Sequence, residues 1–557
     1  MDLEKFFGTY EKSNFDKLCN YITDLGNKVD DLRTHGYPFL DGDYTIDYYK
    51  FLNECNLENK GLTYEEFMNY ISSYFKNVPD YSNPGTMINV IPAVNLYSMA
   101  AMTVAESFNP NFAQDTYSGN LILSELEVAK YMADLVGWNW KTSQGFFTFG
   151  GTGTNLYGLK LAINNVDPDA KMNGIKQNNY FILTSKNGHP CHYQLCDWLG
   201  LGQSSGIEVK SDKFGRIDVE DAEKIIHENI AKGKMFLGFN LTGGSTNEMA
   251  IDPVKQIYDL NAKIAKQYNL NYKPYIHIDS VLGWVFLFFK DYDFSTNNLN
   301  IDKQTINKIK SLTLKAVEFE YADSMGIDFH KTGYCPYSTS MVLIKDKKQY
   351  EKLGDYKIKD LESMHYGDYN PYQTGLEYSR SCHGPISALA CLKSLGKDGF
   401  RQLVINICSV STYFREKLEL NNLIRLVDEG NEGYAIMFII LPEIYSKLSL
   451  DEIKKLGDKE IEEIREYNIG FGKYILSKAV AKEINFFFTS SRSYLIQGTN
   501  IKIGALKAYS MSVFLTNQCI DNLLKELSVC IADYDCNKNT LNSKKNTQIC
   551  VFFVKLF

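Results

Sequence analysis

A glycine-rich segment, Gly150-Gly151-Thr152-Gly153, is the first part of the sequence whose residue types could bind a ligand. It follows the apolar run 146–149 and precedes a helical pattern of apolar residues. Backbone N–H groups at such a helix start attract anions. No Lys-Ser/Thr pair follows, and the segment does not read G-x-G-x-x-G. Two interpretations therefore stay open: a phosphate cradle, or a plain turn between a strand and a helix.

A carboxylate stands at the end of a predicted strand, in His277-Ile278-Asp279-Ser280. In a parallel α/β sheet, the carboxyl ends of the strands face the ligand crevice. There Asp279 could pair with a protonated pyridine nitrogen, bind a metal ion or cap the next turn. The nearby sequence does not supply a convincing set of further metal ligands, so we expect no metal site.

An amine stands at the end of another predicted strand, in Asp328-Phe329-His330-Lys331. A lysine that forms a Schiff base must lose its proton readily, and a desolvated crevice promotes that loss. A solvated surface lysine is the ordinary alternative. A phosphate cradle, a pyridine-pairing acid and an amine, all at strand ends, together form the set that pyridoxal phosphate needs.

Strands that alternate with helices are expected to position these groups. This alternation is typical of βαβ units and of a mostly parallel sheet in an α/β fold. Apolar runs predict strands at 179–184, 207–210, 235–240 and 275–279, and amphipathic spacing predicts helices at 218–231 and 253–268.

The domain organisation follows from changes in pattern along the chain. We expect a helical N-terminal segment at 1–90, a cofactor-binding large domain at 91–383, a smaller α+β domain at 384–540 and a tail at 541–557. In the smaller domain, the spacing of apolar residues predicts helices at 384–396, 400–419, 451–469 and 517–533, and strands at 433–441 and 501–509.

Composition excludes several classes of protein. The chain has 59 Lys and Arg against 67 Asp and Glu, a net charge of −8, which disfavours a nucleic-acid partner. The longest conspicuous apolar run, 281–289, is shorter than the roughly 20 residues that span a bilayer, so no membrane partner is expected. The N-terminus has no secretory pattern, and the 12 cysteines form no zinc or redox motif. We therefore expect a cytoplasmic protein with reduced thiols.

Taken together and in order, these segments resemble the group II pyridoxal-phosphate-dependent amino-acid decarboxylases. The resemblance covers about residues 90 to 400. The segment from Lys331 to Ser338 is most similar to bacterial tyrosine decarboxylases, although sphingosine-phosphate lyases have a related pattern. The matching segments are 124–127 (SELE), 148–152 with Asn155, His189 ahead of Leu199-Gly200, 242–253 (TGGSTNEMAIDP), 277–280 (HIDS), Asp328-x-His330-Lys331, 376–380 (LEYSR) and 395–399.

The resemblance implies the catalytic residues. Lys331 is expected to hold pyridoxal 5'-phosphate as a Schiff base, and Asp279 to keep its pyridine nitrogen protonated. His189 is expected to stack on the cofactor ring, with His192 as a rival for that position. Tyr356 is our candidate for the residue that protonates the carbon from which CO2 leaves, and solvent-exposed loop packing is the alternative for it.

The resemblance also implies further cofactor contacts. Gly151 and Thr152 are expected to hold the phosphate, and Thr246 and His330 to lie in the cofactor site. Ser280 replaces the usual Ala under the ring, where its hydroxyl could contact the cofactor; Ser280 or its neighbour is expected to fill that face. Two further positions depart from the family pattern: Phe329 replaces a usual Pro, and Met249 replaces a usual Gly.

The function implied is decarboxylation of an L-amino acid to an amine and CO2 by a carboxy-lyase, with an aromatic substrate such as tyrosine as one candidate. The implied architecture is the pyridoxal-phosphate fold type I, in a homodimer with shared active sites. Alternatives are a carbon–carbon lyase of the sphingosine-phosphate type, an oxidative deaminase and a non-catalytic pyridoxal-binding dimer. The missing nucleotide-binding motifs weaken the case for a nucleotide-binding module.

Overall fold

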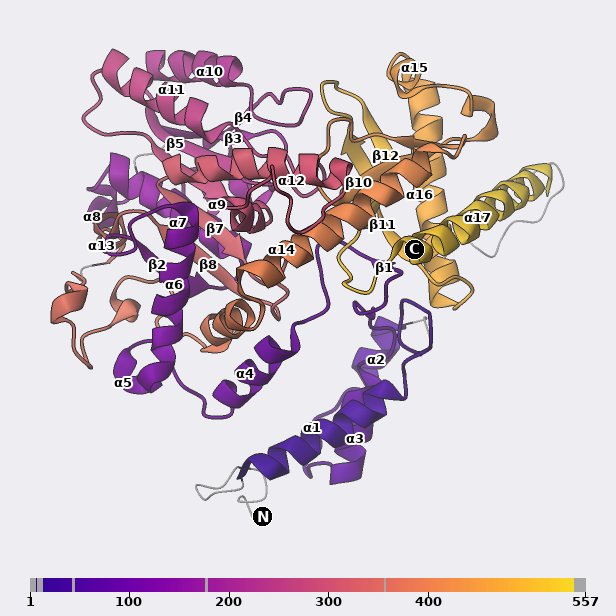
Figure 1. Ribbon diagram of the computed structural model, residues 1–557, viewed down its shortest axis with the longest axis horizontal. Helices are drawn as coiled ribbons and strands as arrows, with labels where there is room; N and C mark the ends of the chain where they lie inside the picture. Colours follow the sequence, from indigo (N-terminus) through magenta and orange to yellow (C-terminus); the bar gives the residue numbers. More distant parts are fainter. Residues whose placement is uncertain (1–6, 8–13, 43–45, 176–178, 355–356, 545–557) are drawn as a thin grey trace. The chain divides into compact units, whose positions relative to one another are not determined.

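The computed structural model of the chain describes residue 7 and residues 14–42, 46–175, 179–354 and 357–544 (Figure 1). Contacts group the described residues into two compact units, the first within 1–87, 470–489 and 514–557, the second within 88–469 and 490–513. No helix among them is both long and apolar enough to cross a membrane. The predicted domains at 91–383 and 384–540 stay predictions, and residues 545–557 of the predicted tail lie outside the described part.

A seven-stranded sheet forms the centre of the second unit. Strand β8 runs antiparallel to both of its neighbours, and the other strands share one direction. The predicted mostly parallel seven-stranded sheet is therefore confirmed. The order across the sheet is β2 (Gln144–Thr148), β8 (Ser340–Ile344), β7 (Ser324–Asp328), β6 (Tyr275–Asp279), β5 (Met235–Thr242), β3 (Tyr180–Ser185) and β4 (Gly206–Val209).

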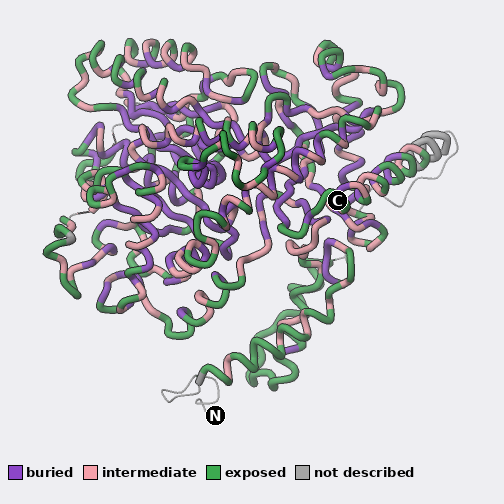
Figure 2. The backbone as a smooth tube through the Cα atoms, in the orientation of Figure 1, coloured by how far each residue is buried: buried purple, intermediate pink, exposed green. Residues whose placement is uncertain are grey.

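Apolar side chains on both faces explain why these runs form buried strands. Successive side chains of a strand point to opposite faces of the sheet. In β3, Tyr180 and Ile182 pack in the cluster that contains the apolar side chains of α7 (Gly151–Val166), whereas Phe181 and Leu183 pack in the cluster on the other face. Both faces are thus covered, as parallel sheets require, and Figure 2 shows the strands as buried.

The carboxyl ends of several strands meet at one edge of this sheet. Thr242 at the end of β5 is in register with Asp279 at the end of β6. Asp328 at the end of β7 pairs with Ser340, where the antiparallel strand β8 begins. The predicted acid and the predicted amine are therefore brought to the same edge, although 52 positions separate them in the sequence.

Helices cover the sheet on both faces. The α-helices of this part are α4 (Leu96–Glu106), α5 (Asp115–Ser118), α6 (Leu123–Val136), α7, α8 (Ala170–Asn173), α9 (Cys191–Trp198), α10 (Val219–Ala231), α11 (Val254–Gln267), α12 (Lys303–Ala316), α13 (Lys347–Glu351) and α14 (His383–Glu419). The 3-10 helices are η2 (Gly119–Ile122), η3 (Gln203–Ser205), η4 (Gly283–Phe289), η5 (Val317–Tyr321), η6 (Leu361–Ser363) and η7 (Pro371–Gln373).

A smaller sheet follows α14 along the chain. Strand β10 pairs antiparallel with both β9 and β12, and β11 is the next neighbour of β12. The elements are β9 (Ile424–Leu426), β10 (Ala435–Ile440), η8 (Glu443–Tyr445), α15 (Leu450–Ile453), α16 (Asp458–Val480), β11 (Phe487–Leu495) and β12 (Lys502–Tyr509).

The first unit is mainly helical. The side chains of α1 and α3 are linked by a hydrogen bond from Lys28 Nζ to Glu65 Oε1 of 2.9 Å. Strand β1 pairs in parallel with the first residues of β11. The bounds are α1 (Asn14–Asp30), α2 (Tyr48–Glu54), α3 (Tyr64–Ser73), β1 (Thr86–Met87) and α17 (Asn517–Lys544), together with the parts of α16 and β11 that fall in 470–489.

The predicted elements are confirmed, with one difference. The two helices predicted at 384–396 and 400–419 form the two arms of α14, which meet at Gly396, where the backbone is not helical (φ 58°). The helix predicted at 451–469 is instead two, α15 and α16. Ser449 and Glu452 form a capping box that starts the short α15, and α16 begins anew directly after Gly457.

Candidate active site

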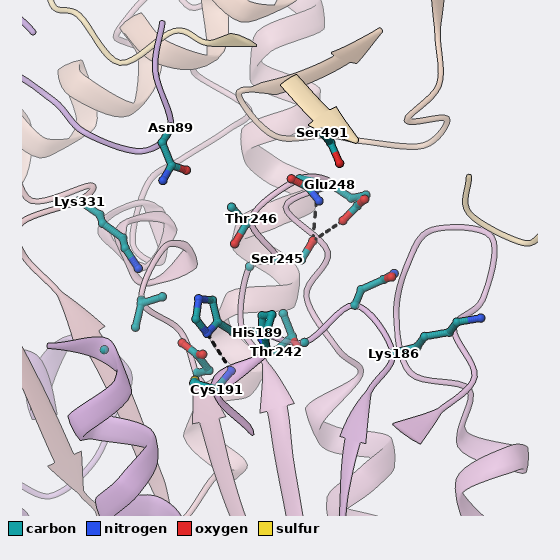
Figure 3. A pocket seen from close by; sticks show the side chains of 18 of the residues that line it. Asn89, Lys186, His189, Cys191, Thr242, Ser245, Thr246, Glu248, Lys331 and Ser491 are labelled. Atoms are coloured by element: carbon teal, nitrogen blue, oxygen red, sulfur yellow. Dashed lines mark hydrogen bonds between the residues drawn. The ribbon is translucent and has the colours of Figure 1, made fainter. Parts of the chain in front are cut away.

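A cavity of about 590 Å³ lies at the carboxyl edge of the large sheet, within the second unit. Figure 3 shows Lys331, His189 and Thr246 around this space, with Glu248 and Ser491 on a further wall. The cavity therefore brings together most of the site residues that were predicted from the sequence. The predicted residues that line it are Gly151, Thr152, His189, Thr246, Asp279, His330 and Lys331.

Lys331 follows β7 through a tight turn, and an acid three residues earlier holds its amine. The distance from Lys331 Nζ to Asp328 Oδ2 is 2.8 Å. Asp328 is itself fixed, because Ser340 Oγ donates to its Oδ1 at 2.5 Å. Burial lowers the pKa of Lys331, but the charge of Asp328 more than offsets this effect, so the pKa lies above its usual value. The amine is thus held as an ammonium inside the cavity.

His330 is fixed by the protein around it. Its Nδ1 accepts a hydrogen bond from the Thr339 N–H at 3.2 Å, and its ring packs against Tyr337 with centroids 4.0 Å apart. Burial lowers the pKa of His330. The ring therefore forms a neutral, fixed part of the cavity wall beside Lys331.

Asp279 presents one carboxylate oxygen with no protein partner. Its Oδ2 accepts from Asn155 Nδ2 at 3.0 Å and lies 3.3 Å from His192 Nε2. Its Oδ1 is buried and has no hydrogen-bond partner. Burial raises the pKa of Asp279, but the hydrogen bond from His192 and the nearby cations outweigh it, so the pKa lies below its usual range. An ionised, half-satisfied carboxylate in a cavity wall fits a cationic N–H donor such as a protonated pyridine nitrogen.

The two candidate histidines have different positions. His189 lines the cavity, and its Nδ1 accepts from the Cys191 N–H at 3.2 Å. The side chain of His192 is only 2% exposed and lies behind Asp279. The geometry therefore favours His189 over His192 as the ring that faces a bound ligand.

The glycine-rich segment is the N-terminus of α7 and leaves little room for a side chain at Gly151. Gly150 has a φ of 131°, which favours glycine. A Cβ on Gly151 would lie 2.9 Å from Asp328 Oδ2 and 3.2 Å from Val281 Cγ1. The bare backbone thus lets a ligand approach the first amides of a 16-residue helix, where the helix dipole favours an anion such as a phosphate.

Two predicted residues, Ser280 and Tyr356, stay predictions for different reasons. Ser280 is not among the residues that line the cavity, and its hydroxyl donates to the Gly326 carbonyl at 2.8 Å, so its contact with a cofactor stays a prediction. Its neighbour Val281 lines the cavity in its place. Tyr356 lies outside the described residues, so its role stays a prediction.

Several lining residues were not predicted. Glu248 accepts from Ser245 Oγ at 2.9 Å and from Gln497 Nε2 at 3.1 Å, and burial raises its pKa. Burial lowers the pKa of Lys507, which lines the same wall, to about 8. Asp328 lies inside the lysine motif, but nothing in that motif assigned it a role of its own. No local pattern pointed to Gln497 or Lys507, which come from the C-terminal part of the chain.

Two matched segments outside the cavity meet behind the glycine-rich segment. Arg380 donates to both carboxylate oxygens of Glu125, at 2.6 and 3.0 Å, and Glu125 also accepts from the Phe147 N–H. Thr148 Oγ1 donates to Glu377 at 2.6 Å. These bonds fix strand β2, which leads directly into the glycine-rich segment. No group of three or more His, Cys, Asp or Glu within the described ranges could hold a metal ion.

Comparisons with known proteins agree with this geometry. The sequence profile of the pyridoxal-dependent decarboxylase conserved domain matches residues 50–439. The acidic amino acid decarboxylase GADL1 of Xenopus tropicalis is 26% identical over 237 residues, 42% of this chain and 44% of the relative. The cysteine sulfinic acid decarboxylase of Rattus norvegicus is 28% identical over 238 residues, 42% of this chain and 46% of the relative. The match thus spans somewhat less than half the length of these two relatives.

A solved structure supports the fold over nearly the whole chain. The structure of mouse CSAD in its apo form has a TM-score of 0.75, with 20% identity over 92% of this chain and 99% of that one. The predicted α/β architecture of fold type I is therefore confirmed.

Proposed function

The chain belongs to the pyridoxal-dependent decarboxylase family, and from this premise we propose that it is a carboxy-lyase that uses pyridoxal 5'-phosphate to convert an L-amino acid into an amine and CO2. One observation carries the proposal. Asp279, which has one carboxylate oxygen without a hydrogen-bond partner, lines one cavity together with Lys331 and the bare helix start at Gly151. These are the groups that the nitrogen, the aldehyde and the phosphate of this cofactor require.

The protein's residues have separate tasks in this scheme. When bound, pyridoxal phosphate supplies an aldehyde that condenses with amines and a ring that accepts the electrons released as CO2 departs. Lys331 would provide the amine that attaches it, and Asp279 would keep the ring nitrogen protonated. The first amides of α7, at Gly151 and Thr152, would hold the phosphate. His189 would cover one ring face and exclude water, and Val281 would contact the other.

Further lining residues are proposed to contact the cofactor or the substrate. His330 and Thr246 lie in the wall and are kept as cofactor contacts. Lys186 and Lys507 supply cations besides Lys331, and every amino-acid substrate carries a carboxylate that such cations attract. Tyr356 is kept as the proposed proton donor.

The identity of the amino acid is a separate question. The two relatives above are named for acidic amino acids and for cysteine sulfinic acid. An aromatic substrate such as tyrosine rests only on the similarity of the segment after Lys331 to bacterial tyrosine decarboxylases. We therefore propose an acidic amino acid as the first substrate to test and tyrosine as the second.

The experiment is a screen of the purified protein, loaded with pyridoxal phosphate, against the common amino acids, with amine and CO2 as readouts. Equimolar amine and CO2 from one amino acid is the expected result. The Lys331→Ala variant should lose both the activity and the covalent cofactor adduct that borohydride traps. A wild-type protein that forms the adduct but releases no CO2 would favour a carbon–carbon lyase, an oxidative deaminase or a non-catalytic pyridoxal-binding protein.

We also propose a homodimer. Exposed apolar side chains on and after α4 support it: Leu96 is 81% exposed, Tyr97 70% and Phe108 77%. A second copy of the chain would cover this surface. Sedimentation should show a dimer that Leu96→Asp combined with Tyr97→Asp weakens, whereas Leu420→Asp, at an exposed apolar residue on another part of the chain, should leave it intact. A monomeric wild-type protein would contradict this proposal.

A cytoplasmic location is proposed on the buried cysteines. Seven of the described cysteines are free thiols buried in the protein, which suits a reducing compartment. Fractionation of cells that express the full chain tests this proposal.

A further inference from the structure

A histidine that the proposed function leaves without a role lies behind Asp279. The side chain of His192 is 2% exposed and that of Asp279 is 8% exposed. The distance from His192 Nε2 to Asp279 Oδ2 is 3.3 Å, and Asn155 Nδ2 donates to the same oxygen at 3.0 Å. Two nitrogens thus lie within hydrogen-bond distance of Oδ2, while Oδ1 has no hydrogen-bond partner.

The other ring nitrogen of His192 determines which of its atoms carries the proton. Nδ1 lies 2.6 Å from Thr184 Oγ1, whose hydroxyl can donate or accept. Nε2 faces a carboxylate oxygen, which can only accept while it is ionised. The proton must therefore be on Nε2, and Thr184 can satisfy Nδ1 by donating to it. The ring is also confined, because a Cβ on Gly188 would lie 2.9 Å from His192 Nδ1.

We propose that His192 is a positioning residue for Asp279: its Nε2–H holds Oδ2, so that the carboxylate stays ionised and Oδ1 remains available to a pyridinium N–H. This inference rests on the proposed function. Asn155 alone would leave the carboxylate with one donor, a weaker arrangement for a buried charge.

The electrostatics of the site support this assignment. Burial of Asp279 raises its pKa, and the hydrogen bond from His192 is the largest effect that lowers it again. Without that donor, protonation of Asp279 would move to higher pH, and a protonated carboxyl could no longer hold the ring nitrogen as a cation. The other titratable groups that face Asp279 or its neighbours are His189, Cys191, His277, Asp328 and Lys331.

The test compares two substitutions that preserve different ring atoms. The amide nitrogen of His192→Gln reaches about where Nε2 lies and can still donate to Asp279. The amide nitrogen of His192→Asn reaches about where Nδ1 lies, so this variant keeps the contact with Thr184 and loses the hydrogen bond to Asp279. Each protein, freed of cofactor, is titrated with pyridoxal phosphate and with its 1-deaza analogue, which has a carbon in place of the ring nitrogen.

The measured quantity is the ratio of the two affinities. The two ligands are titrated separately into portions of one protein preparation. Partial unfolding of a variant therefore lowers both apparent affinities and leaves their ratio unchanged. We expect the wild type to prefer pyridoxal phosphate, His192→Gln to keep that preference, and His192→Asn to reduce it by about tenfold, the usual effect of one hydrogen bond to a charged group. In His192→Asn the remaining preference should also disappear at a higher pH than in the wild type.

The possible results separate this inference from the proposed function. If both substitutions lower the two affinities equally, or neither changes the ratio, His192 does not position Asp279, although wild-type binding of pyridoxal phosphate still supports the proposed function. If the wild type binds both ligands equally well, Asp279 does not recognise the ring nitrogen, and this inference is refuted. If the wild type binds neither ligand, the proposed function fails, and this inference fails with it.

Discussion

Replacing Asp328 by Asn should make Lys331 more reactive, because it removes the charge that keeps the amine protonated. The distance from Lys331 Nζ to Asp328 Oδ2 is 2.8 Å, and the side chains are 25% and 1% exposed. Asn has nearly the same shape and can still accept the hydrogen bond from Ser340. The substitution therefore changes the charge beside the amine more than it changes the packing.

The size of the effect follows from this distance. Two unit charges 2.8 Å apart attract by about 6 kcal/mol at an effective dielectric constant of about 20. The pKa shift is smaller than this attraction alone would give, because burial of the amine opposes its charge and solvent at the exposed quarter of its side chain screens the attraction. Opposite charges this close usually shift a pKa by about 1–3 units, at about 1.4 kcal/mol per unit. We expect the pKa of Lys331 to fall by that amount in Asp328→Asn.

The assay needs no cofactor. Amines of the apo protein are labelled with a small acylating reagent across a range of pH, and the extent at each lysine is read by mass spectrometry. Lys210, 78% exposed, serves as the internal reference. Ser340→Ala is the control, because it removes the hydrogen bond to Asp328 and leaves the charge. An unchanged labelling midpoint for Lys331 in Asp328→Asn, or an equal shift in Ser340→Ala, would refute the reasoning.

Three further substitutions test the surroundings of the site. Gly158→Ala should destabilise the protein by about 1–3 kcal/mol in thermal melts, because the new Cβ would lie 2.3 Å from the His277 ring, whereas Ala normally favours a helix. Arg380→Ala should lower the free energy of unfolding in urea by about 3–5 kcal/mol, since it leaves Glu125 buried and unpaired; a loss below 1 kcal/mol would contradict the pairing. The pKa of Lys507 is lowered by burial to about 8, so Lys507→Met should stabilise the apo protein at pH 7 by up to about 3 kcal/mol. As pH rises through 8, Lys507 loses its proton in the folded state and the cost of its buried charge disappears. The stability gain of Lys507→Met should therefore decrease between pH 8 and the unfolded pKa of about 10.4. A gain independent of pH would contradict this explanation.

The candidate catalytic and cofactor-binding groups could be predicted from the sequence because each stands at the end of a helix or strand with a clear pattern of apolar residues. Asp279 ends a buried apolar run, and Gly151 starts a helical pattern. Parallel strands place such ends at one edge, so these groups meet without any further information. The direction of the Ser280 side chain follows in the same terms. Side chains alternate along a strand, so the residue after an inward-facing Asp279 faces the opposite way.

The partners of these groups were beyond the sequence. Glu125 and Arg380 are 255 positions apart, and Glu248 and Gln497 are 249 apart. Neither pair has a local period or spacing that links its members. Whether a buried acid is paired depends on side-chain directions that only the folded chain supplies, and His192 shows this most clearly. From the sequence, His192 was a second candidate for stacking on the cofactor ring. In the structure, helix α9 instead directs its Nε2 to Asp279 Oδ2.

Two departures from the family pattern can now be weighed by where they lie. Phe329 is buried, and its N–H donates to the Thr339 carbonyl at 2.8 Å, a bond that the usual Pro could not make. Its ring packs 4.9 Å from that of Trp284, in the core beneath the sheet edge. Met249 has a φ of 54°, where the usual Gly would be unstrained, and its side chain is buried against Gly433. Neither residue lines the cavity. Both departures therefore change how the scaffold packs, and they leave the groups that face a cofactor as the family pattern has them.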